Sequence, residues 1–225
     1  ELYAQQWNWK ARYGGEDNVL GDANVRFLND FDGKNSVGID SSDPNGMDDF
    51  VVTQEFHLPV NRKVIFKLRS QDVLHSAYMP HFRAQMNCVP GMVTQFSFVP
   101  TLTTAEMREK PAMIQKVANI NALRAKKSEA LVAKGETALD PYSFDYLLLC
   151  NKICGASHYN MQMKVVVDSP EEFKTWLNEN QSKTIVQAVK TAAAEAKASE
   201  AGSLQTKDST AAGKDTTVVA SAEVK

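Results

Sequence analysis

The stretch from Cys150 to Met161 constrains this chain more than any other, because its twelve residues hold two thiols, an imidazole and a thioether. Soft sulfur ligands combined with imidazole favour copper or zinc over calcium or magnesium. Apolar, strand-like runs flank the stretch at residues 142–149 and 161–167, and Gly155 disfavours a helix within it. The pattern therefore predicts a metal-binding loop between two β-strands.

Three other interpretations of this stretch remain open. If it were helical, its cysteines, histidine and methionine would share one face and could simply pack together. Cys150 and Cys154 could form a disulfide, although three cysteines in total make a poor disulfide framework. The stretch could also hold zinc, but the chain has no second cysteine pair and Met161 suits copper better. His75 follows an apolar run and is the obvious further imidazole for a centre with two thiolates.

Short apolar runs separated by turn residues predict the fold. Strand-like runs occupy residues 5–13, 50–58, 62–69, 92–99, 142–149 and 161–167. Gly, Asn, Asp and Ser dominate residues 14–49, which we expect to form an acidic loop. Many short strands with irregular loops and few helices favour an all-β sandwich or barrel of antiparallel strands.

Two segments depart from the β pattern. Residues 103–134 are rich in Ala, Lys, Glu and Leu, and they begin with a capping-box pattern. A second capping box at Ser169 opens a short helix, and beyond Gln181 the chain has no aromatic residue. The predicted organisation is a β-domain in two parts, 1–102 and 141–180, with a helical insertion at 103–140 and a helical, partly disordered tail at 181–225.

The bulk composition excludes some functions. The chain has 225 residues, 43% of them hydrophobic, which is enough for one well-filled core with appendages. Its formal net charge of −2 argues against nucleic acid as a main partner, because phosphate binding needs a clustered basic excess. The sequence has no run of about 18 apolar residues, which is the length needed to span a bilayer. Residues 1–12 show no signal-peptide pattern.

Three motifs follow one another in the order known from one family. They are Asp72-Val-Leu-His75-Ser, then Asn87-Cys-Val-Pro90-Gly91, then Cys150-x-x-x-Cys154-Gly-x-x-His158-x-x-Met161. Together they resemble subunit II of cytochrome c oxidase, a haem–copper oxidase, and Gln6-Trp7-Asn8-Trp9 is similar to the aromatic motif of that family. The resemblance covers residues 5–100 and 141–178, and the helical insertion and the tail lie outside it.

The resemblance implies a cupredoxin-like Greek-key barrel with a dinuclear copper centre, called CuA. The implied ligands are Cys150 and Cys154 as bridging thiolates, His75 with Met161 for one copper, and His158 with the main-chain carbonyl of Lys152 for the other. Trp7 would be the entry point for electrons from a cytochrome c, with a buried core aromatic as the alternative. The electrons would pass to haem in subunit I, where oxygen is reduced.

The chain departs from the family pattern at three positions. Lys152 stands where the family has Glu. The carbonyl ligand survives this change, but the interfacial magnesium or manganese ion that the Glu side chain reaches is in doubt. Asn87 replaces a common Asp and Met92 a common Arg, so we expect a rebuilt surface toward subunit I.

Membrane attachment is a further expectation from the resemblance. The family carries two transmembrane helices ahead of its aromatic motif. Attachment would therefore come from absent N-terminal helices or from partner subunits. The domain would then lie at the periplasmic face of the inner membrane, or its equivalent, within a membrane complex.

Several further residues have less specific signals. Four loop aspartates form a candidate docking surface for a basic cytochrome, with a solvated acidic loop as the plainer alternative: Asp40, Asp43, Asp48 and Asp49. Their spacing does not match a calcium loop. Cys88 is interpreted as a buried filler. The rival functions are a CuA domain of another redox system, such as nitrous-oxide reductase, and a zinc-binding or metal-delivery module.

Overall fold

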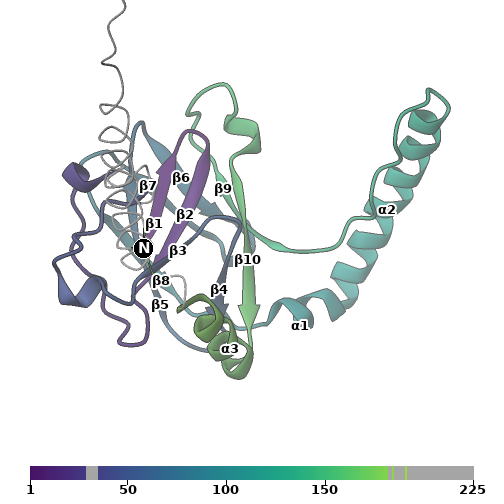
Figure 1. Cartoon of the computed structure of the whole chain (residues 1–225). Helices are drawn as coiled ribbons and strands as arrows, with labels where there is room; N and C mark the ends of the chain where they lie inside the picture. Colours follow the sequence, from purple (N-terminus) through teal and green to yellow (C-terminus); the bar gives the residue numbers. More distant parts are fainter. Residues whose placement is uncertain (29–34, 182–183, 185–190, 192–225) are drawn as a thin grey trace, which may run out of the picture.

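Two five-stranded sheets form the body of the computed structural model, which describes residues 1–28, 35–181, 184 and 191 (Figure 1). The first sheet has the order β3-β2-β1-β5-β8, with β1 Leu2–Gln5, β2 Asn8–Tyr13, β3 Phe50–Val52, β5 Val64–Ser70 and β8 Thr94–Phe98. The second sheet has the order β4-β10-β9-β6-β7, with β4 Glu55–Pro59, β6 His75–Met79, β7 Ala84–Cys88, β9 Tyr146–Cys150 and β10 Gln162–Asp168.

The strand pairing is mostly antiparallel. Two pairs, β1 with β5 and β10 with β4, are parallel and join strands that lie far apart in the sequence. The purely antiparallel arrangement expected from the sequence is thus incomplete, because long crossovers place these strands side by side. The all-β fold class with an inserted helical segment is confirmed.

The core lies between the two sheets, and alternation along the strands places it there. In β9, Tyr146, Leu148 and Cys150 are buried while the residues between them are partly exposed. In β10, Met163, Val165 and Val167 are buried in the same way. Since successive side chains in a strand point to opposite faces, these residues form one apolar layer. That layer continues directly into the cysteine loop between the two strands.

Two predicted strands differ in detail from the structure, and one pair of strands is missing from the prediction. Residues 5–13 form the end of β1, a two-residue turn and β2, rather than one strand. Residues 50–58 are divided between β3 and β4, which belong to different sheets. The pair β6–β7 was not predicted at all, because its polar residues interrupt the apolar alternation on which the prediction relied.

The helical insertion has a base in the core and an arm that extends away from the sheets (Figure 1). It comprises α1, Thr104–Glu109, and α2, Pro111–Val132, and α1 begins with the predicted capping box of Thr103 and Glu106. At the base, Met113 is buried in the main hydrophobic cluster. Along the arm, the Asn121 side chain exchanges two hydrogen bonds with the main chain of Tyr142 in the returning segment.

The last described helix, α3, Pro170–Gln181, covers one end of the sandwich. Its Trp176 ring stacks on His57 of β4 with 4.3 Å between ring centroids. The predicted tail at 181–225 lies outside the described residues, apart from Gln181, Thr184 and Thr191. Within the part of the chain that the structure describes, no helix has the length and apolar character needed to cross a membrane.

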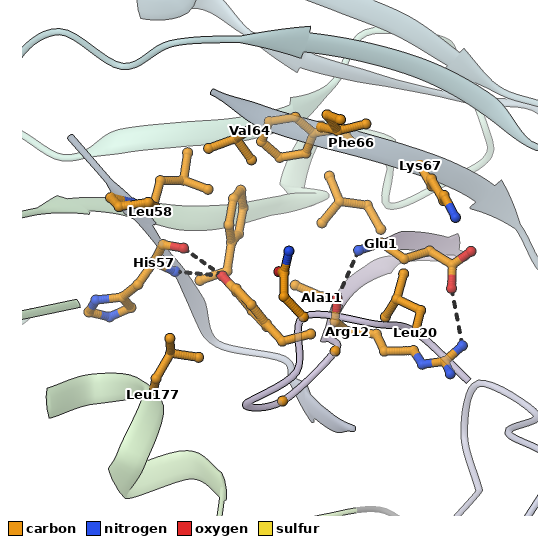
Figure 2. Close-up of a pocket in the computed structure, with 18 of the residues that line it drawn as sticks. Glu1, Ala11, Arg12, Leu20, His57, Leu58, Val64, Phe66, Lys67 and Leu177 are labelled. Carbon is orange, nitrogen blue, oxygen red and sulfur yellow. Dashed lines mark hydrogen bonds and ion pairs between the residues drawn. The ribbon is translucent and has the colours of Figure 1, made fainter. Parts of the chain in front are cut away.

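A cavity of about 650 Å³ opens near Glu1, Arg12 and His57, where it is bounded by Leu58 and Phe66 (Figure 2). None of the ligand, docking or electron-entry residues predicted from the sequence lines this cavity. The predicted ligands lie instead at the end of β9 and in the segments that follow β5 and β9.

Candidate metal centre

Two loops carry the predicted ligands, and the second sheet brings these loops together. His75 is the first residue of β6 and Cys150 is the last residue of β9. These strands are antiparallel neighbours with Ala77 opposite Cys150, so His75 comes to lie beside the start of the cysteine loop. The Cys150 N–H donates to the Met161 carbonyl over 3.1 Å and closes the loop at its base.

The two buried thiols form the middle of the site. Their Sγ atoms lie 3.8 Å apart, and both cysteines are free thiols. The Sγ of Cys150 is 3.9 Å from Nδ1 of the buried His75. Cys150, Cys154 and His75 each offer a ligand atom within 4.8 Å of the other two, and among the described residues this is the group able to hold a metal ion.

The other three predicted ligands surround the thiol pair. His158 Nδ1 lies 3.5 Å and Met161 Sδ 3.8 Å from Cys154 Sγ. The carbonyl oxygen of Lys152 lies 3.2 Å from Cys150 Sγ. All six residues predicted from the sequence are therefore brought together. The helical interpretation of the stretch is wrong, because one 3-10 turn at His158–Asn160 is its only helical element.

Asp72 holds the His75 ring in place. Its Oδ1 accepts a hydrogen bond from His75 Nε2 over 2.8 Å, which leaves Nδ1 free to face the sulfur atoms. Burial opposes the charge on Asp72. Hydrogen bonds from the Gln6 N–H and the His75 ring nevertheless keep the pKa of this carboxyl below its usual value. The edge of Trp9 also meets the ring of His75, with 6.4 Å between centroids.

The donor set fits a soft cation. Burial, and then the neighbouring Cys150, raise the pKa of the Cys154 thiol to about 11, so this thiol holds its proton at neutral pH in the metal-free protein. A bound cation would favour both thiolates, and thiolate, thioether and imidazole are the ligands that copper and zinc prefer. Each thiol also has an imidazole of its own beside it, His75 for Cys150 and His158 for Cys154. The residues present therefore fit copper or zinc, the two metals that the sequence indicates.

Trp7 lies in the turn between β1 and β2, beside the cysteine loop. Its side chain is 39% exposed, so the alternative of a buried core aromatic is excluded. Gly155 makes the close approach possible, because a Cβ at this position would lie 2.9 Å from Cζ2 of Trp7. An exposed aromatic ring next to a buried thiol pair is suitably placed to pass electrons between a metal held there and a docked partner.

The aspartates of the acidic loop are not equivalent. Asp49 is completely buried and paired with Arg12, so it cannot belong to a docking surface as the sequence suggested. Asp40, Asp43 and Asp48 are partly exposed and accept hydrogen bonds from main-chain N–H groups within the loop. Asp30 and Asp32 lie outside the described residues.

Sequence reasoning missed the supporting residues of the site. Asp72 and Gln6 belong to the motifs, but the sequence alone predicts no role for either residue. The position of Asp72, three residues before His75 in a loop, was the available signal for the hydrogen bond between them. Cys88 is buried as expected, and burial raises the pKa of its thiol to about 12.

Comparisons with known proteins agree with these motifs. Residues 2–105 match the family described as cytochrome c oxidase subunit II, periplasmic domain. Over 183 residues the chain is 33% identical to the alternative cytochrome c oxidase subunit 2 of Bradyrhizobium diazoefficiens, a match that covers 81% of this chain and 50% of that protein. This chain is similar to cytochrome c oxidase subunit II.

The match to other cytochrome c oxidase subunit 2 proteins is partial in length. Cytochrome c oxidase subunit 2 of Thermostichus vulcanus is 27% identical over 60% of this chain, and the match covers 29% of that protein. The chain thus spans half or less of the length of these relatives. Among solved structures, the periplasmic domain of cytochrome oxidase subunit II of Bradyrhizobium japonicum aligns with a TM-score of 0.46 at 17% identity, over 81% of this chain and 92% of that one.

Proposed function

We propose that this chain is the electron-transfer subunit of a terminal haem–copper oxidase, which accepts electrons from cytochrome c and passes them to haem in subunit I. The observation that carries the proposal is the convergence of two thiols, two imidazoles, a thioether and a carbonyl from two loops of a subunit II relative. Oxygen reduction would take place in subunit I.

The proposed cofactor is a pair of copper ions. Six groups would hold it: the thiolates of Cys150 and Cys154, the imidazoles of His75 and His158, the thioether of Met161 and the main-chain carbonyl of Lys152. When bound, such a pair accepts and releases single electrons.

The protein supplies a rigid cage for this pair. The cysteine loop is closed at its base by the Cys150–Met161 main-chain bond, and Asp72 orients the His75 ring. A rigid set of ligands rearranges little when an electron arrives. A small rearrangement favours fast electron transfer.

Trp7 is the proposed point of electron entry, because it is exposed and lies against the cysteine loop. Asp40, Asp43 and Asp48 are the proposed docking carboxylates for a basic cytochrome c or cytochrome c domain. We place the domain on the periplasmic face of a membrane complex, in keeping with the description of its family. Lys152 replaces the side chain expected to hold an interfacial magnesium or manganese ion.

A zinc-binding or metal-delivery module is the second candidate. Two cysteines and two histidines are also the ligands of many structural zinc sites, and this chain gathers that set around its thiol pair. The thioether of Met161, 3.8 Å from Cys154 Sγ, would have no role in such a site. Its presence favours copper.

Electron uptake separates the two candidates. The copper-loaded chain is mixed with reduced cytochrome c, and oxidation of the cytochrome is followed in a stopped-flow spectrometer. We expect transfer of about one electron per chain, and none in the control variant Cys150→Ser/Cys154→Ser. A copper-loaded chain that oxidises no more cytochrome than this variant would exclude the electron-transfer function.

A further inference from the structure

The turn between β1 and β2 is fastened to both ligand-bearing loops through a single residue, Gln6. Its main-chain N–H donates to Oδ2 of Asp72 over 2.6 Å. Its side-chain Nε2 donates to the carbonyl oxygen of Cys154, also over 2.6 Å. One bond leads to the loop that precedes His75, and the other leads to the cysteine loop.

Asp72 connects this turn to the metal centre directly. While Oδ2 accepts from Gln6, Oδ1 accepts from Nε2 of the His75 ring. The carboxylate therefore fixes the turn and the imidazole relative to each other. The strand that leads into the turn is bound to the same loop, because the Gln71 N–H donates to the Ala4 carbonyl of β1 over 2.9 Å.

The surface of the cysteine loop is shaped to receive the turn. A Cβ at Gly155 would lie 2.9 Å from Gln6 Nε2 and 3.0 Å from Trp7 Nε1. Gly155 also has a φ of +134°, which L side chains rarely adopt. Glycine at this position lets both Gln6 and Trp7 reach the main chain of the loop.

Burial holds Trp7 only in part, since the residue is 39% exposed. Its neighbour Gln6 makes the two hydrogen bonds that tie the turn to the site. The other neighbour, Asn8, is exposed and starts β2 opposite Gln5. The two hydrogen bonds of Gln6 therefore fix the main chain beside Trp7, while the indole ring itself is only partly covered.

We infer that Gln6 is a positioning residue for electron entry, which holds the Trp7 indole against the Cys154–Gly155 segment. The inference rests on the proposed function, because Trp7 matters for entry only if the site exchanges electrons. Its structural part holds without any metal. A Gln6→Ala variant leaves the six ligands and the thiol pair unchanged, and it removes the bond to Cys154.

The structural part is tested on the copper-free full chain labelled with 5-fluorotryptophan. The chain has three tryptophans, and Trp7→Phe assigns the Trp7 signal in the ¹⁹F spectrum. In Gln6→Ala we expect this signal to move toward its position in the unfolded chain, while the Trp9 and Trp176 signals stay in place. Gln6→Glu, which keeps the size but loses the donor, should behave in the same way. Asn8→Ala is the matched control and should leave the Trp7 signal near its original position.

The functional part is tested on the copper-loaded variants. Gln6→Ala should slow electron uptake from reduced cytochrome c about tenfold or more, since misplacement of a reacting group by about 1 Å can cost that much. The electron paramagnetic resonance spectrum and the reduction potential should not change, whereas a general loss of structure would alter both.

Two results would overturn the inference. One is an unmoved Trp7 signal in both Gln6 variants. The other is an unchanged uptake rate in Gln6→Ala when Trp7→Phe is slow. If the wild-type chain took up no electrons at all, the proposed function would fall, and the ¹⁹F spectra alone would decide whether Gln6 positions Trp7.

Discussion

Asp72 and His75 form a hydrogen bond of 2.8 Å that orients the imidazole, so that Nδ1 faces the thiol pair while Nε2 is bound to the carboxylate. Carboxylates that hold a ligand histidine in this way commonly contribute about 10- to 100-fold to metal affinity. We therefore expect Asp72→Ala to weaken copper binding by that factor in a titration against a competing chelator. Glu109→Ala, which removes an exposed carboxylate at the end of α1, is the control. Equal affinities in the two variants would show that Asp72 has no role in orienting His75.

The acidic loop should assist cytochrome docking through charge. In Asp40→Asn/Asp43→Asn/Asp48→Asn the side-chain oxygens can still accept their local hydrogen bonds, so the variant loses charge and keeps the turns. Electrostatic steering raises association rates by about 10-fold or more, and it weakens as salt shortens the Debye length below about 10 Å. We expect a slower second-order rate with cytochrome c at low salt, and no difference at high salt.

The control for the loop variant neutralises the same number of carboxylates in the helical insertion. It is the triple variant Glu109→Gln/Glu129→Gln/Glu136→Gln. If this control slows association equally, net charge matters and the loop does not. A wild-type rate that stays flat with ionic strength would reduce the loop to a solvated turn.

The outer part of the helical insertion should contact another subunit. Long ordered insertions are usually functional, and residues 123–140 lie beyond the base that packs on the core. Replacing 123–140 with a short Gly-Ser linker keeps Met113 in the core and the Asn121–Tyr142 bonds. We expect an intact copper spectrum, a melting temperature close to that of the wild type, and less subunit I in pull-downs. Loss of the copper spectrum would show that the arm belongs to the core.

Lys152 should replace the interfacial metal ion with its own charge. Its side chain is exposed, while its carbonyl oxygen faces Cys150 Sγ. At an interface, the ammonium would need a carboxylate partner, such as a haem propionate, because a buried unpaired charge costs several kcal/mol. Lys152→Glu should keep the copper spectrum, since the main chain supplies the ligand.

Manganese binding by the assembled complex tests this account of Lys152. We expect none in the wild type and some in Lys152→Glu, measured by electron paramagnetic resonance after manganese loading. A magnesium or manganese ion beside residue 152 in the wild-type complex would contradict the replacement. So would an ammonium with no acidic group within hydrogen-bonding distance.

The candidate ligands were predictable from the sequence because they lie in compact motifs. The spacing of Cys150, Cys154, His158 and Met161 is local, so one loop between two strands can gather all four. His75 lies 75 residues earlier than Cys150. The need for a further imidazole made it a candidate, and the resemblance to a family then implied its role as a ligand. The pairing of β6 with β9 is the physical reason for that connection.

Other features depended on tertiary contacts that no local pattern reveals. Asp49 looked like a surface aspartate in a polar loop, but the Arg12 side chain from β2 reaches it and both are buried. Residues 50–58 looked like one apolar strand, because nothing in the alternation marks the crossover between two sheets. The two hydrogen bonds of Gln6 could not be predicted for the same reason, since their acceptors are 66 and 148 residues away.

Metal analysis of the purified, copper-reconstituted chain tests the central claim most directly. The arrangement of two thiols, each with its own imidazole, predicts two copper ions per chain and a seven-line electron paramagnetic resonance pattern from one electron shared between them. Both should disappear in Cys150→Ser/Cys154→Ser and persist in Cys88→Ser, which changes a cysteine outside the proposed ligand set. A reproducible single metal ion per chain, or zinc taken up in preference to copper, would contradict the account.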